Sequence, residues 1–118
     1  MKRPVFGTLA GGLCMAIVLA CPVGRAAEEA KTPIQQGRDL SVEYCQACHY
    51  FEGTDQAGTL GPPLVAMKPR FPERQRLEQI IYDPHKAIKP YSMMPPFGRN
   101  GLLDSAQINL LMDYLYTL

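Results

Sequence analysis

The five residues 45–49, Cys-Gln-Ala-Cys-His, constrain this chain more than any other stretch. Cys-x-x-Cys-His is the attachment motif of c-type haem. Two thiols three residues apart on a helical turn can form thioethers with both vinyl groups of one porphyrin. The next residue then lies under the iron, where a neutral imidazole can bind it. The motif predicts one covalently bound haem, with Cys45 and Cys48 as thioether residues and His49 as the proximal ligand.

Two other uses of paired cysteines fit less well. A redox-active Cys-x-x-Cys needs no histidine and lies beside a βαβ pattern, which this sequence lacks. A structural zinc ion needs a fourth ligand, usually from a second Cys/His cluster, and the sequence has none. The haem interpretation accounts for both cysteines and the histidine.

The first 26 residues have the pattern of a secretory signal peptide. Lys2 and Arg3 form a positive start, and residues 5–23 carry no charge. Gly24 and Ala26 offer small side chains at the −3 and −1 positions of a cleavage site. We expect a cleaved signal at 1–26, export to the periplasm and a mature domain at 27–118.

Two alternatives at the N-terminus stay open. The uncharged stretch is nearly long enough to span a bilayer, so the signal could remain as an uncleaved anchor. The segment Val18-Leu19-Ala20-Cys21 loosely matches a bacterial lipobox, which would place a lipid on Cys21. We expect neither, and therefore no membrane anchoring.

The mature domain is small and mildly acidic. The whole chain has a net charge of +1, and removing the three basic residues of the signal leaves −2. A nucleic-acid partner would require a basic patch, and nothing in the composition suggests one, so we expect no nucleic-acid partner. A domain of 92 residues has a marginal core of its own. We expect the haem to supply the apolar centre and the haem-free chain to be poorly folded.

The spacing of apolar residues predicts an all-α fold of three or four short helices, with large loops around the haem and no strand. The first helix should open with Pro33 and run to about Ala47. Gly37 lies inside this helix, where a glycine costs about 1 kcal/mol relative to alanine. Close approach of another helix would compensate for that cost. The apolar face of this helix is expected to consist of Ile34, Gly37, Leu40 and Tyr44.

Two more helices follow in the second half. One should cover Glu73 to about Tyr82 and end at the Asp-Pro pair that follows. The last should begin with Asp104 as N-cap, completed by Gln107 as in a capping box, and should pack on the first helix. Between them, residues 84–103 are predicted to form a long ordered loop, which is usually a functional feature.

A proline-rich loop follows the haem motif. Residues 61–64 read Gly-Pro-Pro-Leu, and proline offers a rigid carbonyl without a donor. We expect the carbonyl of Pro62 to accept a hydrogen bond from the second ring nitrogen of His49. Such a bond orients the imidazole and raises its basicity.

The sixth iron ligand decides between electron transfer and an open iron site. Met112 belongs to a helical apolar stripe, and Met67 follows the proline loop too closely to reach the other haem face. Met94 lies about 45 residues past the haem motif and precedes a stiff Pro-Pro-Phe-Gly segment. We therefore predict Met94 as the distal ligand. Met93 and His85 remain alternatives.

These motifs together resemble a class I cytochrome c. More narrowly, residues 94–101 (Met-Pro-Pro-Phe-Gly-Arg-Asn-Gly) and the C-terminal Tyr-Leu-Tyr-Thr-Leu resemble SoxX, the monohaem subunit of the SoxAX cytochrome of bacterial sulfur oxidation. Residues 70–74 and the Asp-Pro pair at 83–84 are also similar. The resemblance covers nearly all of the domain 27–118. It implies a class I fold with His49 and Met94 as axial ligands.

The SoxX resemblance also implies a role and partners. SoxAX couples thiosulfate oxidatively to a cysteine of the SoxYZ carrier protein, and the reaction is attributed to the larger SoxA subunit. This chain would then pass the released electrons to a downstream acceptor and have no active site of its own. The alternatives are a free-standing periplasmic electron shuttle and a haem sensor or enzyme with an open iron.

Overall fold

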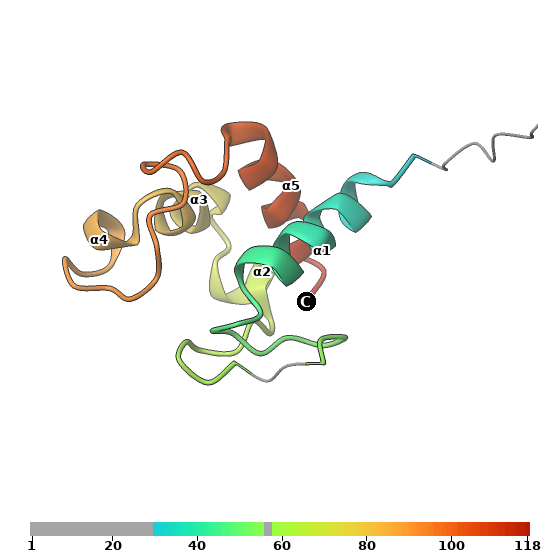
Figure 1. The fold of residues 1–118 in the computed structure, drawn as a ribbon, viewed down its shortest axis with the longest axis horizontal. Helices are drawn as coiled ribbons and strands as arrows, with labels where there is room; N and C mark the ends of the chain where they lie inside the picture. The colour runs from blue at the N-terminus through green and yellow to red at the C-terminus, as the bar shows by residue number, and fades with distance from the viewer. Residues whose placement is uncertain (1–29, 56–57) are drawn as a thin grey trace, which may run out of the picture.

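The structure is a computed structural model that describes residues 30–55 and 58–118. This part of the chain contains no strand and folds into five helices, which confirms the all-α prediction (Figure 1). The helices are α1 (Pro33–Tyr44), α2 (Met67–Arg70), α3 (Arg74–Tyr82), α4 (Pro84–Ala87) and α5 (Ser105–Leu115). The sequence predicted three or four helices, because α2 and α4 are single turns of 4 residues that show no periodicity.

The N-terminal predictions fall outside the described residues. The signal peptide at 1–26, its possible retention as an anchor and a lipid on Cys21 therefore stay predictions. Among residues 30–55 and 58–118, no helix is long and apolar enough to cross a membrane.

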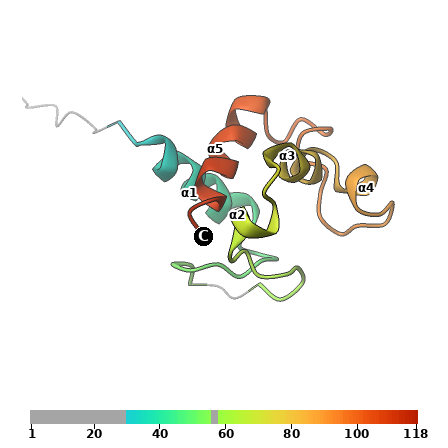
Figure 2. The same ribbon diagram turned by 180° about the vertical axis from the view of Figure 1, so that it is seen from behind.

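Helices α1 and α5 pack on each other at the centre of the domain, as predicted, although they come from opposite ends of the described chain (Figures 1 and 2). A Cβ at Gly37 would overlap the backbone carbonyl of Leu110 and the Cβ of Tyr114. The close approach expected at Gly37 is thus confirmed. Only a residue without a side chain allows these two backbones to lie so close together.

The buried face of α1 differs from the predicted one. Ile34 is 42 % exposed, whereas Ser41 is fully buried. Gly37 and Ser41 lie one turn apart, and both are small enough for close packing. The Ser41 hydroxyl donates to the Gly37 carbonyl at 3.0 Å, so no polar group is left unpaired in the interface. Periodicity of apolar residues alone cannot identify a face made of small residues.

Capping sets the helix ends. Asp104 accepts from the backbone N–H of Gln107, and the Gln107 side chain accepts in return from Asp104, as predicted. Thr32 and Gln35 form a second capping box at the start of α1, which the sequence analysis missed. Helix α1 ends at Tyr44 rather than near Ala47.

Asp83 separates α3 from α4. It is the C-cap residue of α3, and its side chain accepts from the backbone N–H of Lys86 at the start of α4. The predicted loop at 84–103 therefore begins with a helical turn. The remainder, residues 88–103, is called the methionine loop below.

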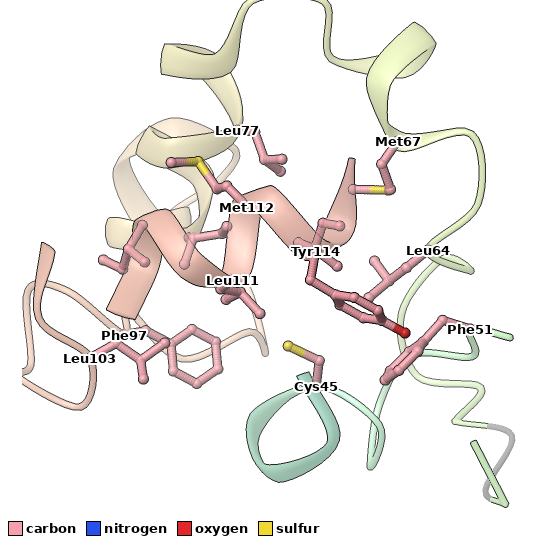
Figure 3. Packing of buried hydrophobic residues seen from close by; sticks show 13 residues of the cluster. Cys45, Phe51, Leu64, Met67, Leu77, Phe97, Leu103, Leu111, Met112 and Tyr114 are labelled. Atoms are coloured by element: carbon pink, nitrogen blue, oxygen red, sulfur yellow. The ribbon is translucent and has the colours of Figure 1, made fainter. Parts of the chain in front are cut away.

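The core lies between α5 and the segments around it (Figure 3). Met112 is fully buried there, which agrees with its assignment to the apolar stripe of the last helix. The other members of this core cluster are Cys45, Phe51, Leu64, Met67, Leu77, Ile81, Phe97, Leu103, Ile108, Leu111, Tyr114 and Leu115.

Candidate haem site

The Cys-x-x-Cys-His residues form a tight turn at the end of α1. Cys45 is the C-cap residue, and its carbonyl accepts from the N–H of Cys48 at 3.1 Å and from that of His49 at 2.9 Å. Cys45 is buried with its sulfur directed towards α5 (Figure 3). The turn brings both cysteines and the histidine to the wall of one cavity.

This cavity has a volume of about 470 Å³. Its wall is mainly apolar and is built by the motif turn, the proline loop, α2, α3, the methionine loop and α5. A flat apolar ligand with a few fixed polar contacts suits such a site. A second hollow of about 530 Å³ lies on α3 and α4, but its lining is largely charged and includes none of the motif residues.

The imidazole of His49 is held in one orientation. Its Nδ1 lies 2.6 Å from the carbonyl oxygen of Pro62. A carbonyl can only accept, so Nδ1 carries the proton and Nε2 keeps its lone pair. A neutral imidazole with a free Nε2 is the form that binds iron. This hydrogen bond from His49 to the Pro62 carbonyl is the one that the sequence predicts.

Backbone packing fixes the loop against that imidazole. The N–H of Gly61 donates to the Cys48 carbonyl at 2.8 Å. A Cβ at Gly61 would overlap the His49 ring, so the loop can lie flush on the imidazole only with glycine there. Two thiols, one oriented imidazole and an apolar cavity fit a covalently attached haem.

The Cys45 thiol does not have the property expected of a redox-active cysteine. Burial raises the pKa of the Cys45 thiol to about 12, and the neighbouring Cys48 adds to the rise. Reactive pairs have thiols of lowered pKa in electropositive surroundings. Across residues 30–55 and 58–118, no group of three or more His, Cys, Asp or Glu side chains could hold a metal ion.

Comparison with known proteins identifies the domain. The family model described as "Cytochrome C oxidase, cbb3-type, subunit III" matches residues 32–115. The chain belongs to this family of c-type cytochrome domains. The family implies a covalently bound haem and electron transfer, and the helices agree with the class I cytochrome c fold. Neither the search of curated proteins nor that of solved structures found a match.

The cytochrome has several candidates for the distal iron ligand. Met94 is half-buried and lines the same cavity as His49. Met93 also lines it but is 82 % exposed. Met67 lines the cavity as part of the core and is 2 % exposed. His85 does not line it. The assignment of Met94 stays a prediction.

Arg70 is a residue of this cytochrome's site that sequence reasoning missed. Its Nη1 donates to the Pro63 carbonyl at 2.8 Å and to the Val65 carbonyl at 3.1 Å, and the residue lines the cavity. Arg70 thus holds in place the carbonyl groups of Pro63 and Val65, which follow Pro62 in the loop. The sequence offers no spacing signal for such a contact, because the acceptors are backbone atoms of a loop.

Proposed function

We propose that this cytochrome is the redox subunit of a SoxAX-type complex in the periplasm. A SoxA-like cytochrome would join thiosulfate oxidatively to a cysteine of a SoxYZ-like carrier protein. This cytochrome would accept the released electrons and pass them to a downstream acceptor. The observation that carries its electron-transfer role is the presence of His49 and Met94 on one apolar cavity.

We infer the axial ligands from the chemistry of these side chains. A haem bound here supplies a one-electron redox centre. His49 offers the lone pair of Nε2, because Pro62 engages the other ring nitrogen. A methionine thioether as second ligand saturates the iron and raises its potential, which suits electron transfer. Met94 is the more suitable methionine, because it is half-buried where Met93 extends into solvent.

Replacing each methionine tests the ligand assignment. In Met94→Leu we expect loss of the long-wavelength iron–sulfur absorption band, a lower reduction potential and binding of carbon monoxide to the ferrous protein. Met93→Leu is the matched control and should leave all three unchanged. Loss of the band in Met93→Leu alone would make Met93 the ligand. A wild-type protein without the band, which binds carbon monoxide, would favour the sensor or enzyme with an open iron.

An apolar rim supports the proposal of a protein partner. Four residues that line the cavity remain largely exposed at its edge: Leu60 (69 %), Ile88 (54 %), Tyr91 (79 %) and Met93 (82 %). Single exposed apolar residues are ordinary, but several at one cavity mouth are typical of an interaction site. A stable complex with a second cytochrome would cover this rim.

Affinity purification tests the complex. The tagged mature protein is purified from its host's periplasm at native level and low salt, and the eluted chains are stained for haem. A stoichiometric larger cytochrome is the expected result. Elution of the chain alone would favour the free-standing shuttle. Co-elution of oxidase subunits would contradict the proposal and favour the assembly after which the family is described.

A pair of leucine variants links that complex to the rim. Leu60→Lys places a charge on the rim and should lower the yield of the larger cytochrome about tenfold or more. Leu102→Lys is the control, since Leu102 is also exposed, at 45 %, but does not line the cavity. Equal yields from the two variants would exclude the rim as the contact surface.

A further inference from the structure

His85 does not line the cavity, yet both its ring nitrogens are engaged next to the methionine loop. Its Nε2 lies 3.0 Å from the Ser92 carbonyl oxygen, and its Nδ1 lies 3.3 Å from Nη2 of Arg99. An arginine can only donate and a carbonyl can only accept. The two partners therefore fix one tautomer, in which Nε2–H donates to Ser92 and Nδ1 accepts from Arg99.

These two partners lie on opposite sides of Met94 in the sequence. Ser92 precedes it by two residues, and its hydroxyl accepts from the backbone N–H of Met94 at 3.2 Å. Arg99 follows it by five residues, and its Nη1 forms an ion pair with Asp83 at 3.0 Å. One imidazole thus connects both flanks of the segment that carries Met94.

The corner between α3 and α4 completes this attachment. The backbone N–H of Arg99 donates to the Tyr82 carbonyl at 3.1 Å. A Cβ at Gly98 would overlap the Tyr82 ring, so the loop lies directly on that ring. Residues 82–85, called the corner below, therefore hold the methionine loop at Ser92 before Met94 and at Gly98 and Arg99 after it.

We propose that His85 is a positioning residue for the distal ligand, which holds the two flanks of Met94 against the corner so that the thioether stays at the cavity. The proposal rests on the proposed role of Met94. A thioether is a weak ligand that must be kept in place by the surrounding chain. The loop also contains three prolines, which cannot donate backbone hydrogen bonds. Side-chain contacts must therefore supply part of its attachment.

The test uses the full haem-loaded protein with His85→Ala and His85→Gln. Carbon monoxide can bind the ferrous protein only after the methionine has left. We expect His85→Ala to bind it about tenfold faster, the factor that corresponds to the loss of about one hydrogen bond. We also expect a weaker iron–sulfur band and a lower reduction potential. His85→Gln should restore much of all three, because its amide can both donate to Ser92 and accept from Arg99.

Arg74→Ala is the control for general loosening of the fold. Arg74 forms an ion pair with Asp113 at 2.8 Å and donates to the Asn109 carbonyl at 3.0 Å, and it does not line the cavity. This variant should unfold at a lower temperature than the wild type while its carbon monoxide rate and band stay unchanged. Equal effects in Arg74→Ala and His85→Ala would overturn the proposal.

Two further outcomes keep the test decisive. Wild-type rate, band and potential in a folded His85→Ala protein would also overturn the proposal. If His85→Ala yields no haem protein, His85→Phe keeps a ring at this position but removes both contacts, to the Ser92 carbonyl and to Arg99, and should raise the carbon monoxide rate about tenfold; an unchanged rate would then overturn the proposal. Failure of the ligand assignment is recognised separately, since Met94→Leu would then keep the iron–sulfur band.

Discussion

At the scale of single residues, the orientation of the His49 imidazole depends on a glycine outside the haem motif. We expect Gly61→Ala to push the His49 imidazole away from the Pro62 carbonyl, because a Cβ would overlap the ring. The imidazole would become a less basic ligand, which stabilises ferric iron less, so the reduction potential should rise. The overlap should also cost about 1–3 kcal/mol of stability. Redox titration and denaturant unfolding of the haem protein measure both effects.

A second glycine provides the control for Gly61→Ala. A Cβ at Gly101 would meet no atom within 4 Å, but its φ is +67°. Gly101→Ala should therefore lose about 1 kcal/mol through backbone strain alone and keep the wild-type potential. An unchanged potential in Gly61→Ala would contradict the role assigned to this contact.

Because of Tyr114, we expect the stability of the folded chain to depend on pH in the alkaline range. Burial raises the pKa of its phenol above 10.0, and the positive charge of Arg38 offsets part of the rise. The folded chain thus keeps this proton at a pH where the unfolded chain releases it. Ionisation then favours the unfolded state, so stability falls as pH rises above about 10. We expect Tyr114→Phe to weaken this fall, measured as unfolding free energy between about pH 8 and 11. Equal slopes of unfolding free energy against pH in the wild type and in Tyr114→Phe would contradict this role of Tyr114.

At the scale of elements, the contact between α1 and α5 depends on Gly37. In Gly37→Ala the new methyl group would overlap the Leu110 carbonyl, which belongs to a helix backbone and cannot move aside alone. The helices must separate, and we expect a loss of about 2 kcal/mol in unfolding free energy. Glu43→Ala, on the exposed side of α1, should change it by less than about 0.5 kcal/mol. Wild-type stability in Gly37→Ala would contradict the close packing.

The sequence predicts those elements that local chemistry determines. The three longer helices, the capping box of Asp104 and the close approach at Gly37 follow from local patterns. Helices α2 and α4 are too short for a period to show. Ile34 was expected to be buried because it is apolar, whereas small residues form the interface. Apolarity is therefore a poor guide to a helix face where two backbones approach closely.

The candidate haem site also contains some residues that the sequence predicts and others that it does not. The haem motif and the proline after Gly61 are short-range signals, and they predicted the residues that now line the cavity with His49. The contacts of Arg70 with loop carbonyls and of His85 with Ser92 join side chains to backbone atoms. Because every residue has a backbone carbonyl, the residue type at the acceptor position does not indicate such a contact. Only the folded chain reveals these supporting residues.

At the scale of the whole molecule, most elements contribute to the wall of a single cavity. The motif turn, the proline loop, α2, α3, the methionine loop and α5 each contribute to its wall. Their direct packing is concentrated where α5 meets α1 and α3. A haem bound in this cavity would contact all of these elements and would therefore act as part of the core.

Removing the haem should therefore unfold much of the domain. The cavity measures about 470 Å³, and a buried void costs about 24 cal/mol per Å³. The upper bound of about 11 kcal/mol, reached only if the space stayed closed and empty, is as large as the whole stability of a typical domain. The haem-free Cys45→Ala/Cys48→Ala chain should thus collapse or expand rather than keep this form. We expect it to bind a hydrophobic dye and to melt without a cooperative transition, while the haem protein in the same buffer melts cooperatively. A cooperative transition of the haem-free chain at the same temperature would show that the helices alone suffice to hold the fold.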